Sequence, residues 1–396
     1  MLDNLYKGQG TKLHTTETWR NLPKLEVDAI DKFRHPSGYL AQPGLVAAVN
    51  VALELGMPLL LTGEPGCGKS DLAHSLAWEL NFPKGSNDDY SKPLCFTVKS
   101  DTQSRDLFYT FDTLGRFRAA RVEKENADAR QYLRFEALGL AILRVLGPDI
   151  IKELQLQDCL DELPKEPQNS VVLIDEIDKA PREVPNDILN EIGRMGFDIP
   201  ELFETGKPRK TVSLRDVKTT IDSVNNQKNS STQITRHNPV IIITSNRERE
   251  LPEAFLRRCV YYHLGLPNFR NHKGITPSHD KNHEVTIENI LETRLGVSIN
   301  NEDNKKNSEK TIIAAGVALF HYLRTEVQML KPPSIAELLN WMKLLQNRCD
   351  NSTNLKDFQS RSIFISSAIV TLFKQQEDQE QAGQLIQSWL DRTTSA

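Results

Sequence analysis

The chain has 396 residues, of which 38% are hydrophobic and 26% charged, and its formal net charge at pH 7 is −4. This composition is typical of a folded protein of about two to three domains and argues against wholesale disorder. The slightly acidic balance excludes a global attraction to nucleic-acid phosphates or anionic membranes, although a local basic patch is still compatible with it.

Cysteine usage and the first residues bear on the compartment. The five cysteines are scattered, with no CxxC or Cys/His ligand spacing, which favours a reducing compartment and no zinc site. Residues 1–24 lack the apolar core of a secretory signal and contain acidic residues that a transit peptide lacks. The apolar run 363–373 is well short of the roughly 20 residues that span a bilayer, so it predicts a buried helix. We expect a cytoplasmic protein without membrane insertion.

The predicted elements begin after a polar N-terminal arm, residues 1–35. Apolar residues recur at helical spacing over residues 45–53, and Gly56 ends this helix before the apolar run 58–61, which predicts a buried strand. Further buried strands are expected over residues 94–98, 171–174 and 240–243. Helices are expected between them, over residues 69–80, 129–146 and 181–195. This alternation predicts an α/β fold with a doubly wound parallel sheet.

The rest of the chain differs in character. Residues 203–238 are mostly polar and predict a hairpin with a flexible tip. Polar stretches at 267–283 and 300–310 precede a smaller all-helical domain, in which Ser334 and Glu337 form a capping box. The predicted division is a 1–35 arm, a 36–270 α/β domain and a 271–396 helical lid domain.

The strongest motif fits G-x-x-x-x-G-K-[ST] and lies between a predicted strand and a predicted helix. It consists of Gly63, Glu64, Pro65, Gly66, Cys67, Gly68, Lys69 and Ser70. Its glycines let backbone amides surround a phosphate at a helix N-terminus. Lys69 would reach the β- and γ-phosphates of a nucleotide, and the Ser70 hydroxyl would bind Mg²⁺. Asp71, which follows directly, is counted with the nucleotide-binding set; the alternative is a Gly-rich turn that only links the two elements.

Two acids follow the strand predicted at 171–174. Asp175 and Glu176 lie at its carboxyl end, where open α/β sheets bind ligands. The pair resembles a Walker B motif: Asp175 would hold magnesium, and Glu176 would deprotonate the attacking water. Two acids after a strand are more often a solvated loop when they occur alone. Because a phosphate-binding motif lies upstream, the functional role of the two acids is favoured over a solvated loop.

Four further polar residues have weaker signals. Asn246 follows the strand predicted at 240–243, where its amide would contact the γ-phosphate or the attacking water; the alternative is a turn cap, and Thr244 is the less certain neighbour. Arg257 and Arg258 are adjacent near a helix end, where arginines are usually solvated or paired with the helix dipole.

Four segments, GEPGCGKS, VVLIDEIDKA, IIITSN and LPEAFLRRC, occur in the order and rough spacing of AAA+ ATPases. The residues of these segments are similar to those of the MoxR-like and dynein-related branch of that family, and the resemblance covers about residues 36–266. The resemblance implies ATP and Mg²⁺ as ligands, and it implies adenine contacts from the upstream segment that contains Tyr39 and Leu40.

The resemblance also implies an assembly. Members commonly form rings, often hexamers, in which an arginine of the neighbouring subunit touches the γ-phosphate. Arg258 best matches that position, with Arg257 the alternate. The lid arginine that senses nucleotide in the family has no match here, and Lys331 is only a weak substitute. Insertions are expected at residues 101–146 and 211–237, and the resemblance suggests a chaperone-like role with a partner bearing a von Willebrand factor A domain.

Three functions stay open from the sequence. The first is a ring ATPase that remodels a protein client. The second is a nucleotide-gated scaffold or switch with slow turnover in a defence or signalling complex. The third, a nucleic-acid-processing AAA+ subunit, fits the acidic balance less well. A GTPase is disfavoured because the sequence has no N-K-x-D motif.

Overall fold

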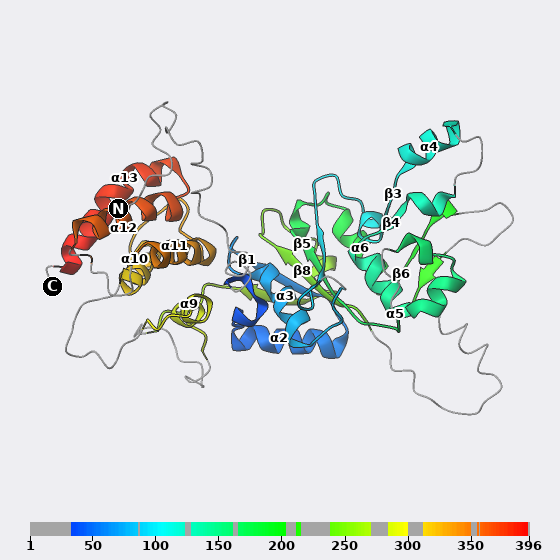
Figure 1. The fold of residues 1–396 in the computed structure, drawn as a ribbon, viewed down its shortest axis with the longest axis horizontal. Helices are drawn as coiled ribbons and strands as arrows, with labels where there is room; N and C mark the ends of the chain where they lie inside the picture. The colour runs from blue at the N-terminus through cyan, green and yellow to red at the C-terminus, as the bar shows by residue number, and fades with distance from the viewer. Residues whose placement is uncertain are drawn as a thin grey trace, which may run out of the picture.

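A computed structural model describes residues 33–85, 88–122, 128–160, 165–202, 211–214, 238–270, 284–299, 312–349, 355 and 357–394. Its centre is a five-stranded sheet in which each pair of neighbours is parallel (Figure 1). In spatial order the strands are β2 (Leu94–Thr97), β5 (Val171–Asp175), β8 (Val240–Ser245), β1 (Leu59–Gly63) and β9 (Val260–Leu264). The order places β1, β5 and β8, which precede the three predicted polar motifs, in the middle of the sheet.

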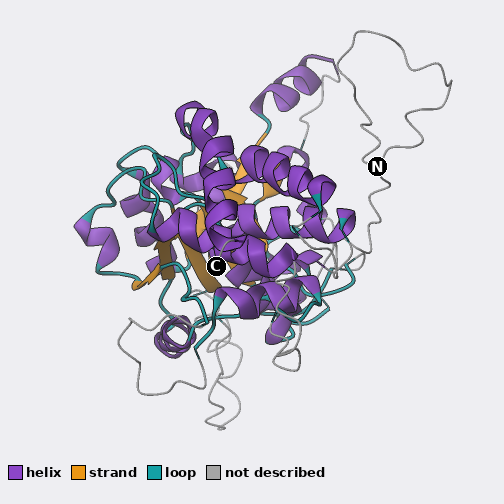
Figure 2. Ribbon diagram, turned by 90° about the vertical axis from the view of Figure 1, so that its left-hand side faces the viewer, coloured by secondary structure: helices purple, strands orange, loops and turns teal. Residues whose placement is uncertain are grey.

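Helices cover both faces of this sheet, as a doubly wound fold requires. Figure 2 shows the strands among helices, with the helical C-terminal part nearest the viewer. Helices α2 (Pro43–Leu55) and α3 (Lys69–Glu79) pack on the face that includes Leu59 and Leu61. Helices α5 (Ala137–Glu153) and α6 (Val184–Arg194) pack on the opposite face, which includes Leu60. Because neighbouring strand residues point to opposite faces, both sets must be apolar, which explains the continuous hydrophobic runs. The predicted fold class is confirmed.

The prediction of one helix over residues 129–146 was wrong. A short helix, η4 (Ala129–Tyr132), is followed by strand β4 (Leu133–Phe135), which pairs antiparallel with β3 (Tyr109–Phe111), and α5 begins only afterwards. In β4 the two apolar ends are buried while Arg134 between them is exposed. That alternation has the period of a strand, and it is too short to stand out from the helical pattern that follows it.

The edges of the sheet also differ from the predictions. Strand β2 lies where it was expected, but as an edge strand it is partly exposed rather than buried, with Cys95 and Thr97 on the open side. The other edge, β9, was not predicted. Tyr261 and His263 are exposed, whereas Val260, Tyr262 and Leu264 face inward, because an edge strand needs only one apolar face.

The remaining elements of this part of the chain are short. The helices are η2 (Pro36–Gly38), η3 (Ser104–Leu107), α4 (Thr113–Val122), η5 (Gln157–Cys159), η6 (Ile177–Lys179), η7 (Pro200–Leu202) and α8 (Glu253–Leu256). Strands β6 (Gly196–Asp198) and β7 (Thr211–Ser213) form an antiparallel pair. The Asn/Ser-rich part of the predicted hairpin, residues 215–237, lies outside the described residues, as do residues 1–32 of the predicted arm.

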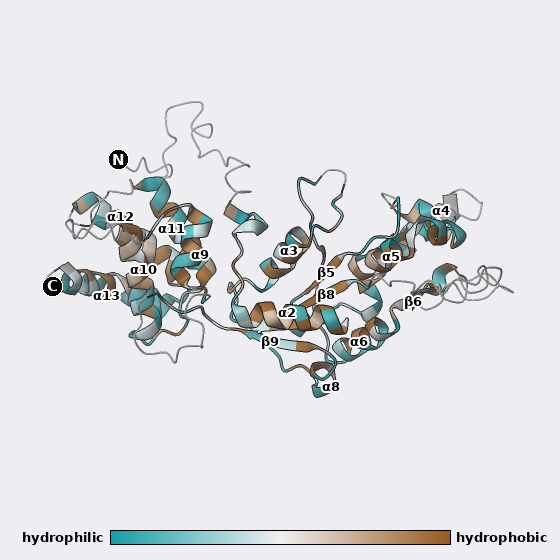
Figure 3. Cartoon of the chain, turned by 90° about the horizontal axis from the view of Figure 1, so that it is seen from below, coloured by the Kyte–Doolittle hydropathy of each residue, from teal (hydrophilic) through white to brown (hydrophobic). Residues whose placement is uncertain are grey.

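The C-terminal part is helical and has a hydrophobic core of its own (Figure 3). It comprises α9 (Ile287–Leu295), α10 (Ile312–Thr325), α11 (Ile335–Arg348), α12 (Phe358–Leu372) and α13 (Gln376–Thr394). The capping box predicted at Ser334 is present at the start of α11. The last apolar run lies in α12, so the predicted helix is present, but it buries only one face and leaves Val370 exposed. The domain boundary at residue 270 stays a prediction. Within the described residues, no helix has the length and apolar character needed to cross a membrane.

Candidate functional site

The loop between β1 and α3 curls tightly because its glycines adopt conformations that other residues avoid. Gly66 and Gly68 have φ values of 78° and 92°. A Cβ on Gly66 would lie 2.8 Å from the Ser334 hydroxyl oxygen, so a side chain there would also collide with the helical domain. Gly68 is the N-cap of α3, which leaves the first amides of that helix unpaired within the helix. The loop therefore has the form that the phosphate-binding motif predicts.

Lys69 is buried inside this loop, with 6% of its surface exposed. Its Nζ donates hydrogen bonds to the carbonyl oxygens of Gly63, at 2.9 Å, and Glu64, at 3.0 Å. Burial raises the pKa of the neighbouring Cys67 thiol, although the charge of Lys69 opposes that rise. The ammonium group is thus held at the N-terminus of α3, where positive charge and free amides favour an anion.

Three oxygen atoms from three elements meet beside the loop. The Ser70 hydroxyl of α3 donates to Asp175 Oδ1 at the end of β5, at 2.8 Å. Thr244 Oγ1 of β8 donates to the same carboxylate oxygen, at 2.5 Å. Hydroxyl and carboxylate oxygens suit Mg²⁺, which needs one or two carboxylates and takes its other ligands from phosphates and water. The described part of the chain holds no group of three or more His, Cys, Asp and Glu side chains that could bind a metal without such help.

Glu176 follows Asp175 in a left-handed backbone conformation, with φ 60° and ψ 49°. Such a conformation costs a non-glycine residue about 1–3 kcal/mol and persists where surrounding contacts fix it. Here the Glu176 amide donates to Thr244 Oγ1 at 2.9 Å. Its carboxylate accepts from Asn246 Nδ2 on Oε1, at 3.3 Å, and from Lys179 Nζ on Oε2, at 2.6 Å. The hydrogen bond to Glu176 raises the pKa of Lys179.

Asp178 fixes the loop that carries Asn246. This carboxylate is buried, with 3% of the residue exposed, and accepts hydrogen bonds from the backbone amides of Asn246, at 3.1 Å, and Glu248, at 2.8 Å. Asp178 thereby sets the place of the Asn246 amide relative to Glu176. Sequence analysis missed this role. The available signal was a third acid that follows the Asp175–Glu176 pair closely.

The upstream segment lies against the other side of the loop. Tyr39 and Leu40 line a pocket together with Gly66 and Gly68, and α9 and α11 contribute Arg294 and Ala336 to its wall. Burial, with a smaller contribution from the charge of Asp71, raises the pKa of the Tyr39 hydroxyl, which therefore stays neutral. The structure thus brings the segment predicted to contact adenine next to the phosphate loop.

Arg294 was not predicted as part of this pocket. It is 8% exposed and donates to the carbonyl oxygens of Phe33 and His35, both at 3.0 Å. Its guanidinium is 3.8 Å from Asp71 Oδ2 in the first turn of α3. Arg294 therefore connects α9 of the C-terminal part both to the segment before η2 and to the first turn of α3.

Arg257 and Arg258 lie away from their own phosphate loop. Arg258 Nη1 donates to Asn190 Oδ1 of α6 at 2.7 Å, and Arg257 forms an exposed ion pair with Glu253 at 2.5 Å. Among the residues that the structure describes, neither arginine donates to a group of the loop from Gly63 to Ser70. The structure therefore does not assign either of them to the site of their own chain.

Comparison with known families decides the classification. The family model described as the AAA domain of the dynein-related subfamily matches residues 58–259, just over half of the chain. The chain belongs to the dynein-related subfamily of AAA domains. The match runs from the residue before β1 to the residue after Arg258, so it includes the motifs that meet at the carboxyl ends of β1, β5 and β8. The AAA domain is a P-loop nucleotide-binding fold.

Solved structures similar to this AAA domain are distant. A single-residue variant of Thermotoga maritima RuvB is 13% identical, with a TM-score of 0.35, and the match covers 83% of this chain and 67% of that chain. C. elegans PCH-2 is 16% identical, with a TM-score of 0.29, over 89% of this chain and 68% of that chain. No curated protein sequence matches the chain. The assignment therefore rests on the family model and on the sheet itself.

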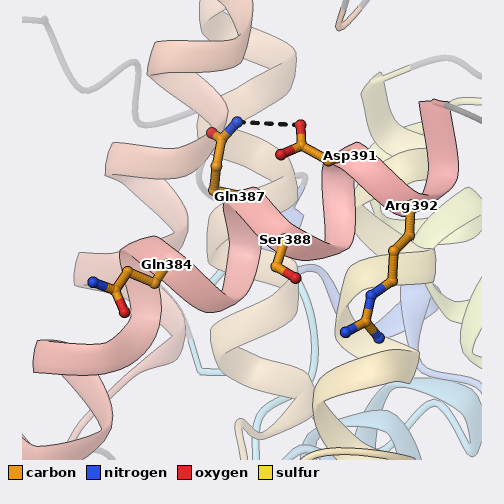
Figure 4. Close-up of a pocket in the computed structure, with 5 residues that line it drawn as sticks. All are labelled: Gln384, Gln387, Ser388, Asp391 and Arg392. Atoms are coloured by element: carbon orange, nitrogen blue, oxygen red, sulfur yellow. Dashed lines mark hydrogen bonds between the residues drawn. The ribbon is translucent and has the colours of Figure 1, made fainter.

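A second hollow lies on α13, within the helical part that follows the AAA domain, and it is shallow (Figure 4). Its lining side chains all come from that one helix: Gln384, Gln387, Ser388, Asp391 and Arg392. Gln387 Nε2 donates to Asp391 Oδ1 at 3.3 Å, and Arg361 of α12 pairs with the same carboxylate at 2.5 Å. None of these residues lines the pocket beside the phosphate loop.

Proposed function

We propose that this AAA domain binds Mg²⁺-ATP at the loop from Gly63 to Ser70 and hydrolyses it within a ring, as a remodelling ATPase that acts on a protein partner. The observation that carries the proposal is the chain of contacts from Ser70 through Asp175 and Thr244 to Glu176 and Asn246. These contacts connect two oxygen ligands suited to Mg²⁺, from Ser70 and Asp175, with the Glu176 carboxylate and the Asn246 amide, which can bind and orient a water molecule.

Each side chain has a role that its position supports. Lys69 would exchange its two carbonyl partners for phosphate oxygens. Ser70 and Asp175 would hold magnesium, which supplies positive charge to the phosphates when bound. Glu176 would accept the proton of the attacking water, and Asn246, already hydrogen-bonded to that carboxylate, would orient the same water. Thr244 keeps both acids in place.

The nucleoside end fits the pocket between the loop and the helical part. Tyr39 and Leu40 would contact the adenine ring, and Asp71 and Arg294 would limit the depth of the pocket. Because Tyr39 keeps its proton, its hydroxyl is a neutral hydrogen-bond donor and brings no charge toward the phosphates.

The ring is supported by the exposure of the paired arginines. Arg258 lies on the surface, where its guanidinium would exchange its hydrogen bond with Asn190 for the nucleotide of a neighbouring subunit. Arg257, in an exposed ion pair, is the alternate. Developing charge on a transferred phosphoryl group is best stabilised by such an arginine. The same proposal includes a hexamer and a partner with a von Willebrand factor A domain, which the family resemblance implies. It also includes a cytoplasmic location, which the scattered free cysteines favour.

A nucleotide-gated switch with slow turnover is the second candidate. The observation that favours it is the 2.6 Å ion pair between Lys179 and Glu176, which occupies one oxygen of the proposed base. While this ion pair holds, that oxygen contacts Lys179 rather than the attacking water. A partner that drew Lys179 away would then speed hydrolysis.

Steady-state ATP hydrolysis measured over a range of protein concentrations tests the proposal. A ring that completes its site with a neighbour's arginine gives a turnover per subunit that rises with concentration and then levels off. Turnover that is constant down to the monomer range contradicts the ring. A low plateau that rises in Lys179→Ala favours the switch, and stimulation by DNA or RNA, but not by protein, would contradict a protein client.

A further inference from the structure

The helical part of the chain contacts the phosphate loop through one ion pair, between Arg324 and Glu64. Arg324, in the last turn of α10, donates through Nη1 to Glu64 Oε2 at 3.0 Å and through Nη2 to Glu64 Oε1 at 3.3 Å. Its Nη1 also donates to the carbonyl oxygen of Pro333 at 3.1 Å. The guanidinium side chain is 12% exposed, whereas that of Glu64 is 60% exposed. Two parallel hydrogen bonds fix the carboxylate more firmly than a single surface contact would.

Two uncharged contacts run beside this pair. The amide of Ala336, in the first turn of α11, donates to the Gly66 carbonyl oxygen at 3.2 Å. Ser334 lies so close to Gly66 that no Cβ would fit between them. The phosphate loop is therefore held by α10 and by the start of α11, and only the contact to Glu64 carries charge.

Glu64 is the one acidic residue within the loop from Gly63 to Ser70. The rest of that loop favours an anion, through Lys69, the amides and the start of α3. An unneutralised carboxylate there would oppose a triphosphate by Coulomb repulsion, and more strongly than it opposes a diphosphate. Arg324 cancels that charge and, by binding both oxygens, keeps the carboxylate on the side of the loop that faces the helical part.

We propose that Arg324 is a positioning residue of the nucleotide site, which neutralises and restrains Glu64 so that the loop accepts the more highly charged nucleotide. The inference rests on the proposed binding of ATP at this loop. It names a regulation of that site: any movement of α10 that releases Glu64 weakens ATP binding more than ADP binding, and ATP binding in turn favours the state in which α10 grips the loop.

Two basic residues that the structure describes in the helical part, Lys331 and Arg294, do not take this place. Lys331 has its backbone amide hydrogen-bonded to Asp378 of α13, at 3.3 Å, and its side chain is exposed. Arg294 is engaged with the carbonyls of Phe33 and His35 on the other flank of the site. Arg324 lies beyond about residue 266, where the family resemblance ends, and no role was predicted for it from the sequence.

Fluorescence titration with mant-ATP and mant-ADP in the presence of Mg²⁺ tests the proposal. Arg324→Ala should raise the Kd for ATP on the order of tenfold and the Kd for ADP by a smaller factor, with the difference shrinking at high salt. Adding Glu64→Gln to Arg324→Ala should restore most of the ATP affinity, because the repulsive charge is then gone. Arg361→Ala, which breaks the Arg361–Asp391 pair within the helical part, is the matched control and should leave both values unchanged.

Two results would overturn the inference. An Arg324→Ala protein that is folded by circular dichroism and binds ATP like the wild type would show that the pair has no effect on the site. A double variant that binds ATP no better than Arg324→Ala would show that the pair acts only as a tie between the two parts. Wild-type protein that binds neither nucleotide would instead contradict the proposed function.

Discussion

The Ser70 hydroxyl donates a 2.8 Å hydrogen bond to Asp175 Oδ1, although 105 positions separate the two residues in the chain. The bond joins the first turn of α3 to the carboxyl end of β5, and Thr244 adds a third element by donating to the same oxygen. A hydroxyl and a carboxylate that already share a proton can exchange that contact for a shared cation without moving their backbones.

Replacing this carboxylate should remove the response to magnesium. We expect Asp175→Ala to bind ATP roughly tenfold or more weakly when Mg²⁺ is present, and to show little difference between buffers with Mg²⁺ and with EDTA. Isothermal titration calorimetry in both buffers measures this. Asp187→Ala, on the exposed side of α6, is the control and should keep the wild-type response. A full magnesium response in Asp175→Ala would assign the metal to other residues.

Replacing the proposed base should separate binding from hydrolysis. Glu176→Gln keeps the size of the side chain and its contact with Asn246, but an amide is a poor proton acceptor. Turnover should fall about 10²–10⁴-fold while the Kd for Mg²⁺-ATP changes little. Phosphate release together with nucleotide titration gives both numbers. Near wild-type turnover would mean that another group accepts the proton.

Thr244 should matter for both acids. Thr244→Val removes a hydroxyl that contacts Asp175 and leaves the Glu176 amide without its acceptor, which costs about 1–3 kcal/mol of unfolding free energy for a buried group. We also expect turnover to fall, whereas Thr244→Ser should keep both properties near wild type. Urea unfolding and ATPase assays check the pair of variants. Equal behaviour of Val and Ser would remove Thr244 from the account.

Arg258→Ala tests whether the site is completed by a neighbouring subunit. Such arginines stabilise charge mainly in the transition state and are worth roughly 10³–10⁵ in rate where best characterised, so hydrolysis should drop far more than ATP binding. Mixing Arg258→Ala with Lys69→Ala subunits should restore part of the activity, because a mixed ring places an intact loop beside an intact arginine. Mixed rings that form and stay inactive would exclude this role, and Arg257→Ala would then be examined in the same way.

The parts of the fold that sequence predicted are those with strong local patterns. The central strands are continuous apolar runs because both of their faces are covered, and Gly56 and the Ser334 capping box mark helix ends by their own chemistry. β4 and β9 were missed because three or five residues of alternating burial carry too little signal.

The sequence predicted the motifs of the candidate site but not the residues that hold those motifs in position. The loop at Lys69 and the acids at Asp175 and Glu176 have fixed spacings that a sequence displays directly. Asp178, Arg294 and Arg324 act through contacts to residues 68, 223 and 260 positions away, respectively, and no local pattern reports such contacts. The sheet order, which brings β5 and β8 beside β1, is what makes these contacts available.

Titration of wild-type protein and of Lys69→Ala with Mg²⁺-ATP by isothermal titration calorimetry tests the central claim most directly. Lys69→Ala removes the charge that would offset the β- and γ-phosphates, and it should abolish measurable binding while circular dichroism shows an intact fold. Wild-type protein should bind about one ATP per chain. Equal ATP affinity of the two proteins would contradict the assignment of this loop as the nucleotide site.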